Sequence, residues 1–218
     1  MASTTIAGMS RLPSVLSHPD LPEAELHAAK LDGELYRVDQ CFSPVDEIET
    51  SELRARALLL TIPSRLIVEQ RSAAWIYGAT TLPSTHQFCT AIRARAATAT
   101  LVKLKVREVV IAAGDQVSIA GLSVTTPLRT VVDLARHSPV FEDDEFRMVG
   151  GLLRIGGLGF ADCRAVLDRH RNLPHKALAL RRIEEAIRRI EVVHQPTRDS
   201  DPRARHLHGP TDQPINRR

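Results

Sequence analysis

The fold is decided by two phrases, RSAAWIYG at residues 71–78 and VTTPLRTVVDLAR at residues 124–136. The first predicts a helix that ends at Gly78. In the second, Thr126 is suited to cap a helix and Pro127 to occupy its first position. Between them, residues 86–92, 101–112 and 117–124 have strand character, with turn signals at Gly114-Asp115 and Gly121. These features predict a compact α+β module.

The first 48 residues predict a small winged-helix-like unit. The apolar spacing of Met9, Leu12, Val15 and Leu16 predicts one short helix, and a second is expected from Pro22 to Gly33. Residues 35–38 and 41–45 then predict two short strands around a turn. Two helices followed by a hairpin is the order of elements in a winged helix.

The remaining chain predicts a mixed sheet-and-helix domain over residues 49–194. Ser51 is suited to cap a helix that runs to Leu59, and a short buried strand is expected at residues 66–68. Three helices, at residues 142–153, 161–170 and 176–190, predict a terminal bundle. Residues 195–218 have few apolar side chains, so we expect a disordered tail.

Charge is distributed unevenly along the chain. The net charge is only +3, but residues 1–50 hold three Lys and Arg against nine Asp and Glu, whereas residues 51–140 hold eleven against five. The excess of positive charge therefore lies in the middle of the chain. Within it, residues 102–107 read VKLKVR, and this alternation predicts one apolar and one cationic face of a strand.

The residues indicate a binding protein rather than an enzyme. The sequence contains no Gly-rich phosphate loop, His-Glu-x-x-His helix or Gly-x-Ser-x-Gly turn. Its three isolated cysteines indicate buried thiols in a reducing compartment. Neither a signal peptide nor an apolar run long enough to cross a membrane is present. We therefore expect a cytoplasmic protein without catalytic residues, cofactor or metal.

Two further interpretations concern acidic residues. Asp143, Asp144 and Glu145 could hold a metal, but acids are also common in a first helical turn because they suit the helix dipole. Asp133 and His137 lie four residues apart, so they can interact on one helix face without any catalysis. A solvent-facing side of a half-covered sheet is likewise the structural alternative for the basic strand.

The two phrases, the turn IAGLSV at residues 119–124 and the order of the N-terminal elements together resemble the AbiEi-type antitoxins of type IV toxin–antitoxin systems. The similarity spans roughly residues 20–190. It implies an N-terminal winged helix that binds operator DNA and represses its own operon. It also implies a larger C-terminal domain that counteracts a toxin of nucleotidyltransferase fold.

The expected partners are thus double-stranded operator DNA and a cognate nucleotidyltransferase-like toxin. The acidic balance of residues 1–50 departs from a DNA-reading winged helix, which should present cations to phosphates. The residues expected to contact DNA or toxin are Lys30, Arg37, Arg71, Arg93, Arg95, Lys103, Lys105 and Arg107. Two alternatives remain open: a DNA-binding transcriptional regulator without a toxin partner, and a nuclease-related enzyme that uses the acids near Asp143.

Overall fold

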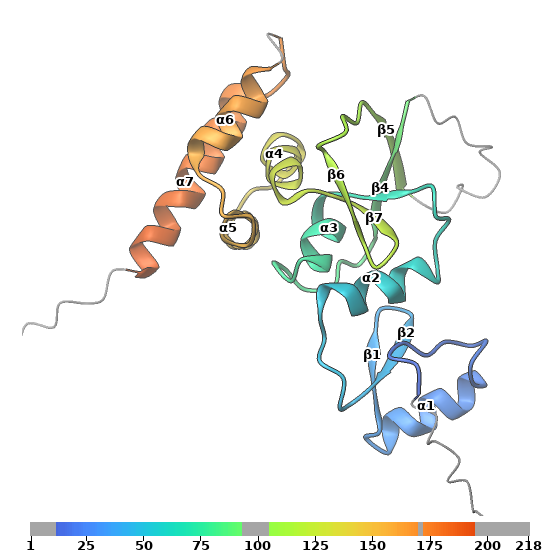
Figure 1. Ribbon diagram of the computed structural model, residues 1–218. Helices are drawn as coiled ribbons and strands as arrows, with labels where there is room; N and C mark the ends of the chain where they lie inside the picture. Colours follow the sequence, from blue (N-terminus) through green and yellow to red (C-terminus); the bar gives the residue numbers. More distant parts are fainter. Residues whose placement is uncertain (1–11, 93–104, 170–171, 195–218) are drawn as a thin grey trace, which may run out of the picture.

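The computed structural model describes residues 12–92, 105–169 and 172–194, and it has the mixed α+β architecture expected from the sequence (Figure 1). The strands form a two-stranded and a five-stranded sheet. The N-terminal unit lies at one end of the larger sheet, and the C-terminal helices lie beside it (Figure 1). Arg93, Arg95 and Lys103 fall outside the described residues.

The N-terminal unit consists of helix α1 (Glu23–Leu31) and the antiparallel hairpin of β1 (Leu35–Val38) and β2 (Cys41–Pro44). α1 and both strands lie where the sequence predicts them, and Gly33 follows the helix with φ of 78°. Four apolar side chains from these elements and the preceding segment form a small core: Leu16, Leu26, Leu35 and Phe42.

The helix predicted around Met9 to Leu16 is wrong for its described part, and Met9 itself lies outside the described residues. Leu16 pairs instead with Phe42 through two backbone hydrogen bonds of 2.8 and 2.9 Å, which adds an extended segment to the hairpin. Leu12, which the helical spacing would place inside, is 56% exposed. Among the described residues, one helix therefore precedes the hairpin rather than two.

The second sheet has the strand order β5-β4-β3-β7-β6. Its strands are β3 (Ile67–Val68), β4 (Gln87–Ala91), β5 (Lys105–Val109), β6 (Gln116–Ile119) and β7 (Leu122–Thr125). β3 pairs antiparallel with β4 and parallel with β7, β4 pairs parallel with β5, and β6 pairs antiparallel with β7. Residues 117–124 therefore hold a hairpin. Ala120 and Gly121 both have positive φ there, as the tightest hairpin turns require.

The two faces of this sheet differ in chemistry. Val68, Phe88 and Val106 are cross-strand partners, and with Val124 they face a core shared with helix α2 (Ser51–Leu59). α2 is capped by Thr50, whose side chain accepts a hydrogen bond from Leu53 N at 3.3 Å, not by Ser51 as expected. On the other face, Cys89 lies opposite Arg107. The alternation expected around residue 106 is thus present in the described part of β5.

Helix α3 (Gln70–Ile76) connects the sheet to a second core built from α4 (Pro127–His137), α5 (Asp143–Gly156), α6 (Phe160–Asp168) and α7 (Lys176–His194). α4 contacts α3 and all three later helices (Figure 1). Gly150 and Gly151 of α5 allow α7 and the turn after α3 to approach closely, because a Cβ on them would lie 3.1 Å from Ile190 and 3.2 Å from Ala79.

The three cysteines are free and buried, as the sequence predicts. The Cys41 thiol donates to the Ala57 carbonyl oxygen at 3.6 Å, which ties the N-terminal hairpin to α2. Burial, with the nearby Asp39 charge, raises the pKa of Cys41 to about 11, and burial raises that of Cys163 to about 11. These thiols are therefore protonated and act as small apolar groups at neutral pH.

Candidate functional site

Helix α4 presents three charged side chains along one face. Arg129, Asp133 and Arg136 are separated by four and three residues, so they lie above one another on the helix. The helix begins where the sequence predicts: Thr126 accepts a hydrogen bond from Arg129 N at 3.3 Å, and Pro127 occupies the first turn. The phrase at residues 124–136 thus encodes both the start of a helix and the charged face that it carries.

These side chains form a charge network with groups from the sheet, which we call the Asp133 network. Arg129 Nε lies 2.8 Å from Asp133 Oδ2, and Arg129 Nη1 lies 2.6 Å from Asp115 Oδ2. Arg107 donates to both carboxylate oxygens of Glu69, at 2.9 and 2.6 Å, and approaches Asp133 Oδ2 at 3.5 Å. The network therefore joins the end of β3, β5, the loop before β6, and α4.

Burial makes the network electrostatically strong. The Glu69 and Asp133 side chains are each only 2% exposed, so water screens their charges weakly. Hydrogen bonding to Glu69 is the main cause of a raised pKa for Arg107. Burial alone would lower the pKa of Arg129, but Asp133 and Asp115 outweigh it and raise the pKa. These two arginines therefore stay charged, and three carboxylates are balanced by Arg107, Arg129 and Arg136.

Asp133 also has an oxygen without a hydrogen bond. Its buried Oδ1 lies 3.9 Å from both Arg136 Nη1 and His137 Nδ1, which is too far for a hydrogen bond. His137 Nδ1 lies 3.0 Å from the Asp133 backbone oxygen instead. Burial lowers the pKa of His137, so the ring is neutral near pH 7. The Asp133–His137 pair predicted on one helix face is thus a structural contact.

The two sequence phrases meet through Tyr77. Its hydroxyl donates to the Thr125 carbonyl oxygen at 2.9 Å, immediately before α4 begins, and burial raises its pKa to about 12. Ala74 packs in the same core as Val131 and Val132. Gly78 follows α3 with φ of 80°, a backbone conformation that favours glycine.

The predicted contact residues that fall within the described ranges are distributed over α1, β1, α3 and β5. Lys30 is exposed in the last turn of α1, and Arg37 donates to Asp39 O and Gln40 Oε1 beside it. Arg71, on α3, pairs with Glu145 of α5. Lys105 begins β5 opposite Gln87. Arg107 is held by internal carboxylates rather than standing on an open face.

Sequence reasoning missed Glu69, Arg129 and Arg136 as members of the Asp133 network. The spacing of Arg129, Asp133 and Arg136 was a usable signal, because charged residues at intervals of four and three share a helix face. The signal for Glu69 was weaker. A single acid between a buried strand and a helix does not reveal that an arginine 38 residues later reaches it.

The acidic run at the start of α5 is divided among three arginines. Asp143 pairs with Arg189 at 2.7 Å, Asp144 pairs with Arg147, and Glu145 pairs with Arg71. Glu145 also accepts from Glu142 N at 3.1 Å, as a capping residue does. Within the described ranges, no group of three or more His, Cys, Asp or Glu side chains is arranged to hold a metal.

A second polar constellation links Ser72, His86 and Asp39. Ser72 Oγ lies 3.1 Å from His86 Nδ1, and His86 Nε2 lies 3.2 Å from Asp39 Oδ2. Ser72 is fully buried and already accepts a hydrogen bond from Gln87 N at 2.8 Å. Because no substrate can reach that hydroxyl, the arrangement holds the N-terminal hairpin against α3 rather than supplying a nucleophile.

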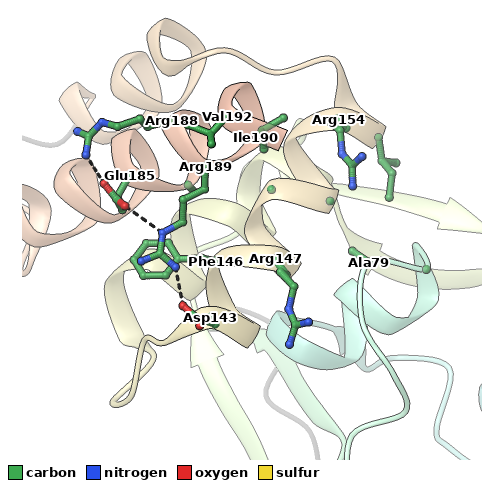
Figure 2. A pocket seen from close by; sticks show the side chains of 15 residues that line it. Ala79, Asp143, Phe146, Arg147, Arg154, Glu185, Arg188, Arg189, Ile190 and Val192 are labelled. Atoms are coloured by element: carbon green, nitrogen blue, oxygen red, sulfur yellow. Dashed lines mark hydrogen bonds and ion pairs between the residues drawn. The ribbon is translucent and has the colours of Figure 1, made fainter. Parts of the chain in front are cut away.

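A hollow of about 1140 Å³ lies between α5 and α7 (Figure 2). Arg189 crosses it, pairing with Glu185 and Asp143 while its guanidinium lies 3.9 Å above the Phe146 ring. Four arginines and two acids line it: Arg147, Arg154, Arg188, Arg189, Asp143 and Glu185. We call this hollow the α5–α7 groove.

A protein-family model matches part of the chain. The model of the AbiEi antitoxin C-terminal domain matches residues 66–143. No curated protein matches the chain. Among solved structures, the RV2827C protein from Mycobacterium tuberculosis is similar with a TM-score of 0.45 and 15% sequence identity, over 80% of this chain and 72% of that one. None of the helices in the described ranges is long and apolar enough for a membrane crossing.

The Asp133 network yields a stability prediction. Replacing Asp133 with Ala leaves Arg107, Arg129 and Arg136 crowded around a partly buried position that has lost its charge partner. We expect the free energy of unfolding to fall by about 3–5 kcal/mol, measured by urea denaturation. The control is Asp144→Ala, since that side chain is 70% exposed; its effect should stay within about 0.5 kcal/mol. Equal effects of the two substitutions would contradict the prediction.

Proposed function

We propose, from the premise that residues 66–143 are an AbiEi antitoxin C-terminal domain, that this chain is the antitoxin of a type IV toxin–antitoxin system. It counteracts a nucleotidyltransferase-like toxin and represses its own operon by binding DNA. The observation that carries the proposal is the family match, and both phrases on which the resemblance rests lie within the matched residues.

The chemistry of the described residues supports binding without catalysis. The groups best suited to chemistry are already engaged: Glu69 and Asp133 with arginines, Ser72 with Gln87 N and His86. A catalytic acid, base or nucleophile must instead be free to contact substrate. The matched domain thus acts as a folded platform, and antagonism of the toxin proceeds through its surface.

DNA binding is assigned to the N-terminal unit together with the cations of the β4–β5 region. His18, His27 and Arg37 line a hollow of about 430 Å³ beside α1, with Glu23 as its acid. Lys30 is exposed on the same helix. Because residues 1–50 are acidic overall, much of the affinity should come from Arg93, Arg95, Lys103 and Lys105. Arg107 serves the internal network and is not included in this proposed surface.

Co-expression tests the antitoxin role. The neighbouring reading frame of the same operon is expressed with and without this chain, and growth is followed. We expect that frame to arrest growth alone and this chain to restore it, because a folded antitoxin removes the toxic activity. A version of this chain with an early stop codon is the control. A harmless neighbour, or a toxic one that this chain fails to relieve, would exclude the role.

The salt dependence of binding to upstream DNA tests the DNA contacts. Each phosphate contact contributes about 0.9 to the slope of log affinity against log salt concentration. Lys103→Ala with Lys105→Ala should therefore weaken binding and make that slope less steep by about two. The matched control, Arg164→Ala with Arg169→Ala on α6, should leave the slope unchanged. A wild-type chain that does not shift upstream DNA at low salt would rule out autoregulation.

This pair of experiments also separates the alternative function. A transcriptional regulator without a toxin partner would shift upstream DNA with the predicted salt slope, yet its neighbouring frame would not be toxic. The contact between Tyr77 and Thr125 favours neither function by itself, whereas the family match favours the antitoxin.

A further inference from the structure

The α5–α7 groove lies at residues 143–192 and in the Gly78-Ala79 turn, mostly beyond the matched domain. Its α5 side reads RMVGGLLR at residues 147–154. Arg147 and Arg154 are seven residues apart, so they project from the same helix face about 10 Å from each other. Gly150 and Gly151 lie between them on that face. The result is two cations that flank a stretch of helix without side chains.

The floor of the groove is apolar. Ile190 of α7 and Ala79 approach the two glycines closely, so backbone and aliphatic atoms lie where side chains would otherwise stand. Ile155 and Val192 line the same groove, and they are 51% and 66% exposed. Exposed apolar side chains beside a hollow are typical of a surface that another chain covers.

The charges around this floor are unbalanced in favour of cations. Arg188 and Arg189 together balance the two lining acids, since Arg189 pairs with Asp143 and Glu185 and Arg188 pairs with Glu185 (Figure 2). Arg147 has only an exposed pair with Asp144, and such pairs contribute little. The side chain of Arg154 has no hydrogen bond or ion pair with any residue in the described ranges. Arg147 and Arg154 are therefore available to an incoming anion.

We propose that the α5–α7 groove binds an acidic amphipathic helix of a partner protein. The matching helix carries two acids seven residues apart, with apolar residues three and four positions after the first. Its acids pair with Arg147 and Arg154. Its apolar stripe covers the floor that Ile190 and Ala79 form over the two glycines. This is the arrangement by which an amphipathic helix occupies a hydrophobic groove.

Two other occupants fit the groove less well. A nucleic-acid backbone carries a charge at every phosphate, so the apolar floor between the two arginines would leave phosphates without partners. The chain's own residues 195–218 carry five Arg against three Asp, and this net positive charge does not complement the arginines. The spacing of two cations around an apolar floor favours a peptide of the opposite charge.

The test uses the full chain and a designed helical peptide with Glu at positions i and i+7 and Leu at i+3 and i+4. Binding is measured by fluorescence anisotropy at physiological salt. We expect the peptide to bind the wild-type chain, and Arg147→Glu with Arg154→Glu to weaken binding by about tenfold or more. A second peptide with Lys in place of both Glu residues should bind that variant better than wild type. This exchange of preference also shows that the variant is folded.

The control variant is Arg164→Glu with Arg169→Glu, which changes the net charge equally at exposed positions on α6 and immediately after it. It should bind the acidic peptide as wild type does. The proposal is overturned if the acidic peptide does not bind wild type, if both double variants weaken it equally, or if duplex DNA without operator sequence binds wild type and loses binding specifically in the Arg147→Glu, Arg154→Glu variant.

Discussion

The rest of the structure depends on one interaction, the pairing of the buried Asp133 carboxylate with the arginines that surround it. A buried charge is stable only where opposite charges and hydrogen bonds replace water. Here those groups come from two elements: Arg129 and Arg136 lie on α4 with Asp133, whereas Arg107 lies on β5. The requirement to surround one anion therefore fixes the position of α4 relative to the sheet edge.

Such a network contributes specificity more than net stability. Well-packed apolar side chains of similar volume are often as stabilising as a buried ion pair, but they accept many arrangements. Charges accept few, because a displaced α4 would leave Asp133 or Arg107 without a partner. Arg107 pairs with the buried Glu69 and Asp133, so it does not contribute to an open cationic face. Strand alternation alone would have placed it on such a face.

Local features of the fold could be predicted because their causes are local. Thr126 and Pro127 begin α4, Gly78 ends the α3 segment, and the strands of the N-terminal hairpin lie where their apolar pattern places them. The segment before α1 could not be predicted, because Leu16 pairs with Phe42, which lies 26 residues later in the sequence.

The pairing of Glu69 with Arg107 likewise depends on a sheet register that single-sequence patterns do not determine. The α5–α7 groove combines both kinds of cause: its arginine spacing is visible in the sequence, but its floor exists only because Ile190 and Ala79 meet the glycines.

A double-mutant cycle on Arg129 and Asp133 tests the central claim most directly. The free energy of unfolding is measured for wild type, Arg129→Met, Asp133→Leu and the double variant. Because the two groups are 2.8 Å apart and largely buried, we expect a coupling energy of at least about 1.5 kcal/mol, with the double variant less destabilised than the sum of the single changes. Additive effects, with a coupling energy near zero, would contradict the account that this network organises the domain.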